Sequence, residues 1–223
     1  MVYMFYAETI DFTTLRLGDV LEGYIEAIPL IEEPLNDIIF KGYKYDLKIH
    51  NPSFSIVMTP CCSIGQNTIS LAPLRKITSD IFKDRNSKVI EDFTLLNSEI
   101  ETKDIVSEEI WNNRYTPELR EKYELEGKKW AYIDLFFYSE YNIFEEYEVE
   151  VKYSKDDIKS YKTRYYMVDF KNISQLRCNK IITNQIHDVI LKTKCLELSI
   201  NAREQLREKI TNYYGRIPDE DLI

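Results

Sequence analysis

Two short apolar runs on either side of a turn constrain the fold more than any other part of the sequence. Residues 54–58 (FSIVM) and 68–74 (TISLAPL) are apolar and rich in residues that favour strands. Thr59-Pro60 ends the first run, and Gly65-Gln66-Asn67 is typical of a turn. Because strands joined by a short connection usually lie side by side, the two runs predict neighbouring strands of one sheet.

The segment before these runs also predicts strands. Residues 15–31 (LRLGDVLEGYIEAIPLI) are too densely apolar for one face of a helix, and Gly18, Gly23 and Pro29 interrupt them. We therefore expect two short strands or one bent strand there, with Asp19 at the start of the first.

Residues 38–50 (IIFKGYKYDLKIH) alternate with a period of two. Such alternation is typical of a strand with one buried face. We expect Tyr43, Tyr45, Leu47 and Ile49 to face inward.

Strand patterns return after residue 130. Residues 130–141 contain an aromatic run, residues 144–153 (FEEYEVEVKY) alternate acidic and apolar side chains, and residues 165–170 form a third apolar run. The acidic positions of the second segment predict the solvent-exposed face of an antiparallel strand. Lys155-Asp156-Asp157 predicts a turn toward a further strand.

Helices are expected in two places. Between residues 76 and 129 the sequence changes character, and Thr116 followed by Pro117 is typical of a helix start, with Gly127 as its end. The second is a terminal amphipathic helix with Ser199 as N-cap and Gly215 as C-cap. This helix would place Ala202, Leu206, Ile210 and Tyr213 on one face.

Composition limits the classes of function. The net charge of -9 argues against general nucleic-acid binding, because Lys and Arg supply most of the affinity for phosphate. The first residues do not have the pattern of a signal peptide, and no stretch approaches the roughly 20 apolar residues of a membrane span. We therefore expect a cytoplasmic protein with no membrane partner, in which the four cysteines are free thiols.

The cysteines do not have the spacing of a metal site. Zinc ligands usually come in pairs two to four residues apart, whereas Cys61 and Cys62 are adjacent and Cys178 and Cys195 stand alone. Six scattered glycines also form no phosphate-binding loop. The sequence predicts no metal and no cofactor.

Three residues are candidates for catalysis. Cys62 lies at a strand end, where a thiol could act as nucleophile with His50 or His187 as base. Asp134 and Asp169 interrupt apolar strand patterns, so each faces solvent or is held by a buried partner. The simpler interpretation of Cys62 is a core thiol, because nothing in the sequence establishes the electropositive setting that lowers a thiol pKa.

The end of the terminal helix is a candidate binding surface. Tyrosine is enriched at protein interfaces, and Tyr213 and Tyr214 stand beside Arg216. These residues would dock another protein. Alternatively, the two tyrosines pack the helix onto the rest of the domain.

Three motifs resemble known proteins. The segments LRLGDVLEG, SIVMTPCCSI and NTISLAPLRKI occur in the order seen in toxin-like SH3 barrels of the PemK/MazF type. The chain is more similar to uncharacterised bacterial proteins with a Ser-Gln-x-Cys-Asp-Ile-like strand motif, a Leu-Ala-Pro-like motif and a final helix followed by an arginine. The matching positions are Thr59, Pro60, Cys62, Ser63, Ile64, Leu71, Ala72, Pro73 and Arg216.

The resemblance implies a fold more than an activity. Thr59-Pro60 replaces Ser-Gln, and Ser63 replaces the aspartate after the cysteine. The resemblance also implies a role in a prokaryotic stress or phage-defence system.

Together these observations predict a single α+β domain over residues 1–223. Its β core, residues 15–75 and 130–172, would form a partly open antiparallel SH3-like barrel, with a helical insertion at 76–129 and a C-terminal helical segment at 180–216. The leading function is a protein-binding or accessory module. The alternatives are a nuclease- or hydrolase-type enzyme around Cys62 and a small-ligand sensor.

Overall fold

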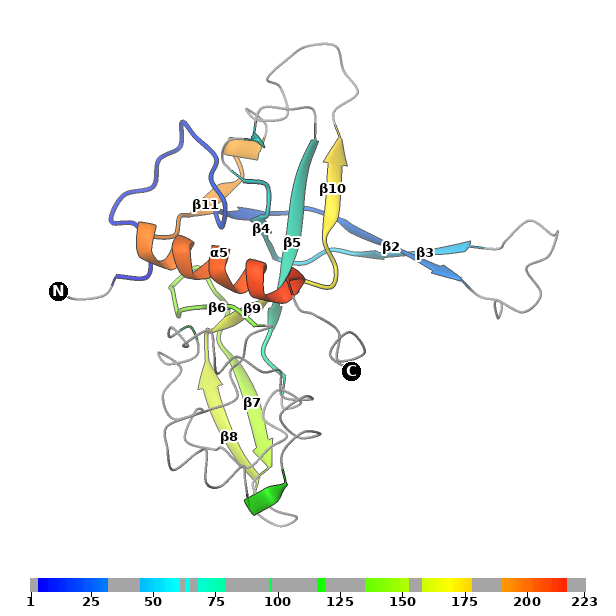
Figure 1. Ribbon diagram of the computed structural model, residues 1–223, viewed down its shortest axis with the longest axis vertical. Coiled ribbons are helices and arrows are strands. Elements are labelled where there is room, and N and C mark those ends of the chain that lie inside the picture. Colours follow the sequence, from blue (N-terminus) through cyan, green and yellow to red (C-terminus); the bar gives the residue numbers. More distant parts are fainter. Residues whose placement is uncertain are drawn as a thin grey trace. The chain divides into compact units, whose positions relative to one another are not determined.

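In the part of the chain that the structure describes, the fold is mostly β, with a curled antiparallel sheet of half-barrel form and a C-terminal helix (Figure 1). This architecture is consistent with the expected α+β class. The computed structural model describes residues 4–31, 45–60, 63–64, 68–78, 97, 116–118, 135–152, 158–177 and 190–215. Among these residues, no helix has both the length and the apolar character needed to cross a bilayer.

The contacts divide the chain into two compact units. Unit 1 comprises Met1–Phe5, Arg75–Phe170 and Ser199–Ile223, and unit 2 comprises Tyr6–Leu74 and Lys171–Leu198. The expectation of a single domain stays a prediction, because two compact units can belong to one domain.

The sheet of unit 2 contains the strands that the sequence indicates most clearly. β1 (Val20–Glu22) lies between β11 (Lys194–Leu196) and β4 (Phe54–Val57), and β4 pairs with β5 (Thr68–Lys76). β10 (Ser174–Arg177) pairs with β5 as well. Ile56 stands opposite Val20 on one side and Ala72 on the other, so the predicted pairing of the two apolar runs is confirmed.

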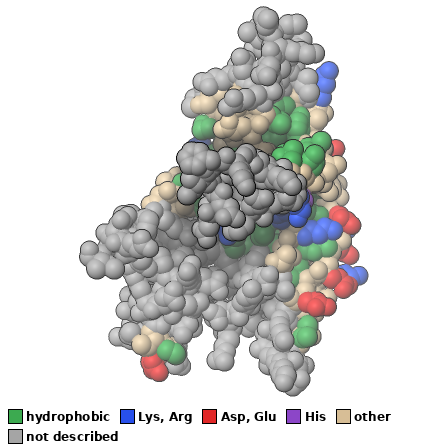
Figure 2. All heavy atoms as spheres, turned by 90° about the vertical axis from the view of Figure 1, so that its right-hand side faces the viewer, with side chains coloured by type: hydrophobic (Ala, Val, Ile, Leu, Met, Phe, Trp, Pro, Cys, Tyr) green, Lys and Arg blue, Asp and Glu red, His purple; other side chains and the backbone are tan. Residues whose placement is uncertain are grey.

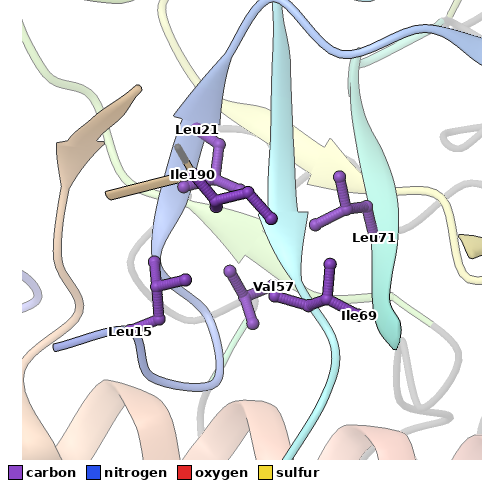
Figure 3. Packing of buried hydrophobic residues seen from close by; sticks show 6 residues of the cluster. All are labelled: Leu15, Leu21, Val57, Ile69, Leu71 and Ile190. Carbon is purple, nitrogen blue, oxygen red and sulfur yellow. The ribbon is translucent and has the colours of Figure 1, made fainter. Parts of the chain in front are cut away.

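A cluster of aliphatic side chains forms the core of unit 2. Figure 3 shows these side chains directed toward one another. They come from the segment before β1, from β1, β4 and β5, and from the turn before β11: Leu15, Leu21, Val57, Ile69, Leu71 and Ile190.

A separate two-stranded ribbon follows β1 and precedes β4. β2 (Glu26–Ile31) pairs with β3 (Tyr45–His50), with Glu26 opposite His50 and Ile31 opposite Tyr45. The predicted strand is confirmed, but the predicted inward orientation is wrong for Leu47 and Ile49, which are 60% and 61% exposed. Within the described residues β3 pairs only with β2, so no second layer covers these side chains.

Unit 1 contains two antiparallel pairs. β6 (Phe137–Tyr138) pairs with β9 (Tyr166–Val168), and β7 (Tyr147–Lys152) pairs with β8 (Ile158–Thr163). In β7 the side chain of Val149 is buried, whereas Glu148 and Glu150 are exposed. The predicted acidic outer face is therefore confirmed.

The predicted terminal helix is present as α5 (Ile200–Tyr214). The Ser199 hydroxyl accepts a hydrogen bond from the backbone N–H of Ala202, as expected of the N-cap. The side chains of Ala202, Leu206 and Lys209 are buried. The segment 180–216, expected to be helical, also contains strand β11.

Most of the expected helical insertion at 76–129 lies outside the described residues. Pro117 and Glu118 are helical directly after Thr116, in agreement with the predicted helix start.

Candidate functional site

Of the three catalytic candidates, Asp169 alone belongs to the described residues. The Asp169 carboxylate lies 3.4 Å from Nε of Arg75, and both side chains are partly buried. Asp169 thus has a cationic partner, but this partner is only partly buried, so neither of the two expected settings describes Asp169 fully. Cys62 and Asp134 lie outside the described residues, so their candidacy stays a prediction.

The two tyrosines at the end of α5 contact the strand region of unit 1. The Tyr213 ring lies 5.4 Å from the ring of Phe170, and the Tyr214 hydroxyl donates to the Phe170 carbonyl oxygen at 3.4 Å. Tyr214 nevertheless remains largely exposed. Packing of the helix therefore accounts for Tyr213, and partner binding by the pair stays a prediction. Arg216 lies outside the described residues.

Cys195 is a free thiol with the properties of a core residue. Its sulfur donates to the carbonyl oxygen of Val20 at 3.4 Å, and burial raises its pKa to about 12. A thiol with this pKa stays protonated at neutral pH and is a poor nucleophile. Among the described residues, no group of three or more His, Cys, Asp or Glu is placed to hold a metal ion.

A buried ion cluster in unit 2 joins the segment 11–19 to strand β11. Its centre is the ammonium group of Lys194, which donates to the Asp19 carboxylate at 2.8 Å and the Glu197 carboxylate at 2.9 Å. The same nitrogen donates to the carbonyl oxygens of Asp11 at 2.8 Å and Thr14 at 3.0 Å. Four oxygen atoms therefore lie within 3.0 Å of an ammonium group that has three protons, so each proton has an acceptor.

A tight turn places Asp19 in the cluster. The backbone N–H of Asp19 donates to the carbonyl oxygen of Arg16, and Gly18 between them has a φ of 83°. A positive φ at the third position of a turn favours glycine. The predicted strand punctuation at Gly18 thus has a specific role in orienting the neighbouring carboxylate.

Arg16 and Asp11 complete the cluster. The Arg16 guanidinium donates to the carboxylates of Glu197 and Asp11, and the backbone N–H of Asp11 donates to Glu197. Hydrogen bonds from Thr13 and Thr14 hold the pKa of Asp11 well below its usual range.

The pKa values of the two carboxylates that contact Lys194 are shifted in opposite directions. Burial raises the pKa of Asp19 to about 6, although Lys194 opposes this shift. Burial would also raise the pKa of Glu197, but hydrogen bonds from Lys194 and from the Asp11 N–H outweigh it, and the pKa is lowered. Lys194 pairs with one oxygen of Asp19, Oδ2, whereas Oδ1 of Asp19 is buried and has no hydrogen-bond partner among the described residues. Because the cluster ties segment 11–19 to β11, we interpret it as a structural support for that segment.

Nothing in the sequence marks Lys194 or Glu197 as buried, because Lys and Glu are usually on the surface. Only Asp19 stood out, through its place after Gly18.

Three exposed apolar side chains of unit 2 lie on the β2–β3 ribbon or directly before it. Ile25, Leu47 and Ile49 are 57%, 60% and 61% exposed. Figure 2 views the molecule from the side on which the ribbon lies in Figure 1, and hydrophobic side chains reach the surface there among acidic and basic ones.

The register of the ribbon places Ala27, Leu47 and Ile49 on one face, and Ile25 directly precedes β2. Ala27 stands directly opposite Ile49, and residues two positions apart in a strand point to the same side. We call Ile25, Ala27, Leu47 and Ile49 the ribbon face.

Comparisons of the chain with protein families, with curated proteins and with solved structures find no match.

Proposed function

We propose that the chain is a cytoplasmic protein-binding accessory module and that the ribbon face contacts its partner. The observation that carries this proposal is the exposure of Leu47 and Ile49 on one face of a two-stranded ribbon, with the exposed Ile25 directly before its first strand. A contiguous exposed apolar patch marks an interaction surface more often than scattered apolar residues do.

The energetics of the ribbon support the same proposal. A two-stranded ribbon is only marginally stable in water unless one of its faces packs against something. Complete burial of one Leu or Ile side chain contributes about 1.5–3 kcal/mol, so covering the exposed parts of three such side chains contributes about 3–5 kcal/mol. A partner that covers the ribbon face would therefore stabilise both the complex and the ribbon.

We also propose that the half-barrel is SH3-like and that the module serves a prokaryotic stress or phage-defence system. The order of the motifs supports the first part, since the Gly18-Asp19 turn opens β1 and the two apolar runs form β4 and β5. The resemblance of these motifs alone supports the second part.

The ribbon face can be tested with a double substitution, Leu47→Lys with Ile49→Lys. The matched control is Ile158→Lys with Ile200→Lys, which alters two exposed isoleucines of unit 1. Each protein is expressed in its host, cross-linked, and its neighbours are quantified by mass spectrometry. We expect the ribbon variant to lose at least one partner by about tenfold or more, and the control to retain it.

The proposal would be refuted by a ribbon variant that retains every partner of the wild type. Loss of the partner from both double variants would also refute it, because the effect would then not belong to the ribbon. Circular dichroism and urea unfolding establish that both variants are folded.

A further inference from the structure

Among the residues that the structure describes, no strand pairs with the outer edge of β3. Within the described residues the ribbon consists of β2 and β3 alone, so each strand has one neighbour and one open edge. An open edge is a template for pairing with another strand.

The position of Pro29 shows which residues of β3 have backbone N–H and C=O groups that point to the open edge. Pro29 stands opposite Leu47, and because proline has no N–H the two cannot exchange a pair of hydrogen bonds. The hydrogen-bonded pairs are therefore the adjacent ones, including Ile28 with Lys48. It follows that the N–H and C=O groups of Leu47 and Ile49 point away from β2.

The open edge of β2 is less suited to pairing. The positions that address it include Pro29, which contributes no donor at the centre of the strand. The edge of β3 is therefore the one equipped to receive a further strand.

The sequence of β3 is complementary to itself in the antiparallel direction. If Leu47 stands opposite Leu47 of a second copy, Asp46 stands opposite the second copy's Lys48, and the symmetry repeats this pairing. The apolar Tyr45 then stands opposite the second copy's Ile49. Opposite charges and apolar residues in directly opposing positions stabilise antiparallel strands.

The alternation of inward- and outward-pointing backbone groups along β3 agrees with this register. Leu47 opposite Leu47 would be a hydrogen-bonded pair, which requires the N–H and C=O of Leu47 to point outward, as Pro29 establishes. The Asp46–Lys48 positions then become the closer, non-hydrogen-bonded pairs. Lys48 is exposed and accessible to a second chain.

We propose that two copies of the chain associate by antiparallel pairing of their β3 edges, centred on Leu47. The two ribbons become one four-stranded sheet in the order β2, β3, β3 and β2. This inference goes beyond the proposed function, because edge pairing leaves the ribbon face open and joins the two faces into one larger apolar surface.

The pairing is short, so the association is weak. One strand edge buries less than the roughly 1,200 Å² typical of stable complexes. We therefore expect a monomer–dimer equilibrium that depends on protein concentration, and that a partner covering the joined face would strengthen.

Reversing the charge at position 46 or at position 48, and then mixing the two variants, tests the proposal. The variants are Asp46→Lys and Lys48→Asp, and the full chain is studied by sedimentation velocity over a series of concentrations. Each variant alone places like charges opposite each other twice, so we expect about tenfold weaker self-association than the wild type. An equimolar mixture of the two restores opposite charges, and we expect it to associate like the wild type.

A second pair of variants tests the backbone contribution. Leu47→Pro removes the outward N–H at a position that does not bond to β2, and Leu47→Ala is its matched control for the lost side chain. We expect Leu47→Pro to be monomeric and Leu47→Ala to retain part of the association.

The proposal is overturned if the wild type remains monomeric at every concentration, or if the mixture associates no better than each variant alone. These outcomes leave the partner-binding test untouched, since that test measures cross-linked neighbours of the ribbon face. A wild type that dimerises but loses no partner on ribbon substitution would instead refute the proposed function alone.

Discussion

At the residue scale, the buried ion cluster of unit 2 shows how a charged side chain is accommodated in the interior. The side chains of Lys194 and Asp19 are fully buried, and that of Glu197 is nearly so. Burying a charge is costly unless partners satisfy it, and here two carboxylates and two backbone carbonyls surround one ammonium group. The cluster therefore fixes the position of segment 11–19 against β11.

Removing the central cation should destabilise the chain strongly. Lys194→Met leaves two buried carboxylates without their shared partner, so we expect the free energy of unfolding to fall by about 3–5 kcal/mol in urea titrations. The control is Lys76→Met, which breaks an exposed ion pair with Glu145 and should cost less than about 1 kcal/mol. Equal losses in the two variants would contradict a structural role for the cluster.

The pH dependence of stability should contain a contribution from Asp19. Its pKa is raised from 3.8 to about 6 by burial, so the folded state holds this proton more tightly than the unfolded state. The stabilising effect is complete below pH 4 and is lost as the pH rises through 6, with a total of about 3 kcal/mol.

Asp19→Asn removes this proton-binding site and leaves the other carboxylates in place. We therefore expect the stability of the wild type, relative to this variant, to decline between about pH 4 and 6 in urea titrations at fixed ionic strength. A difference that is constant over this range would show that Asp19 titrates normally.

At the element scale, the burial expected from the apolar pattern is found in β4, which has two neighbouring strands, but not in the ribbon. β4 lies between β1 and β5 in the sheet, and its residues are buried along its length. β3 has a regular alternation as well, but Leu47 and Ile49 are exposed, and among the described residues β3 pairs with β2 alone.

Because β5 is buried and β3 is exposed, we expect a Leu→Ala substitution to lower the free energy of unfolding more in β5 than in β3. Leu71 lies in the core cluster and is almost completely buried, so Leu71→Ala should lower the free energy of unfolding by about 2–5 kcal/mol. Leu47→Ala should change it by less than about 0.5 kcal/mol, because its side chain is already exposed. A large loss from Leu47→Ala would mean that the ribbon face is covered in the isolated protein.

At the scale of the whole molecule, each compact unit draws on segments that are distant in the sequence. Unit 2 combines Tyr6–Leu74 with Lys171–Leu198, and the boundary between Leu74 and Arg75 falls inside strand β5. No linker marks this boundary, because the chain continues through a hydrogen-bonded strand. A division of this kind cannot be read from composition or from breaks in a pattern.

Local patterns predicted much of the fold. The alternation of apolar residues, the turns at Gly18 and Gly23 and the cap at Ser199 depend on neighbours a few residues away, so β1 to β5, β7, β9 and α5 could be expected from the sequence. The short strands β10 and β11 were missed, since three or four residues contain too little pattern.

The candidate sites depended on contacts that the sequence does not encode locally. Lys194 meets Asp11 across 183 positions, and Asp169 meets Arg75 across 94. The sequence by itself determined which segments become strands or helix, because backbone conformation follows from local periodicity and turn chemistry. Only the tertiary structure decided which carboxylates are buried beside a cation and which apolar faces stay exposed, because burial depends on what the rest of the chain places against them.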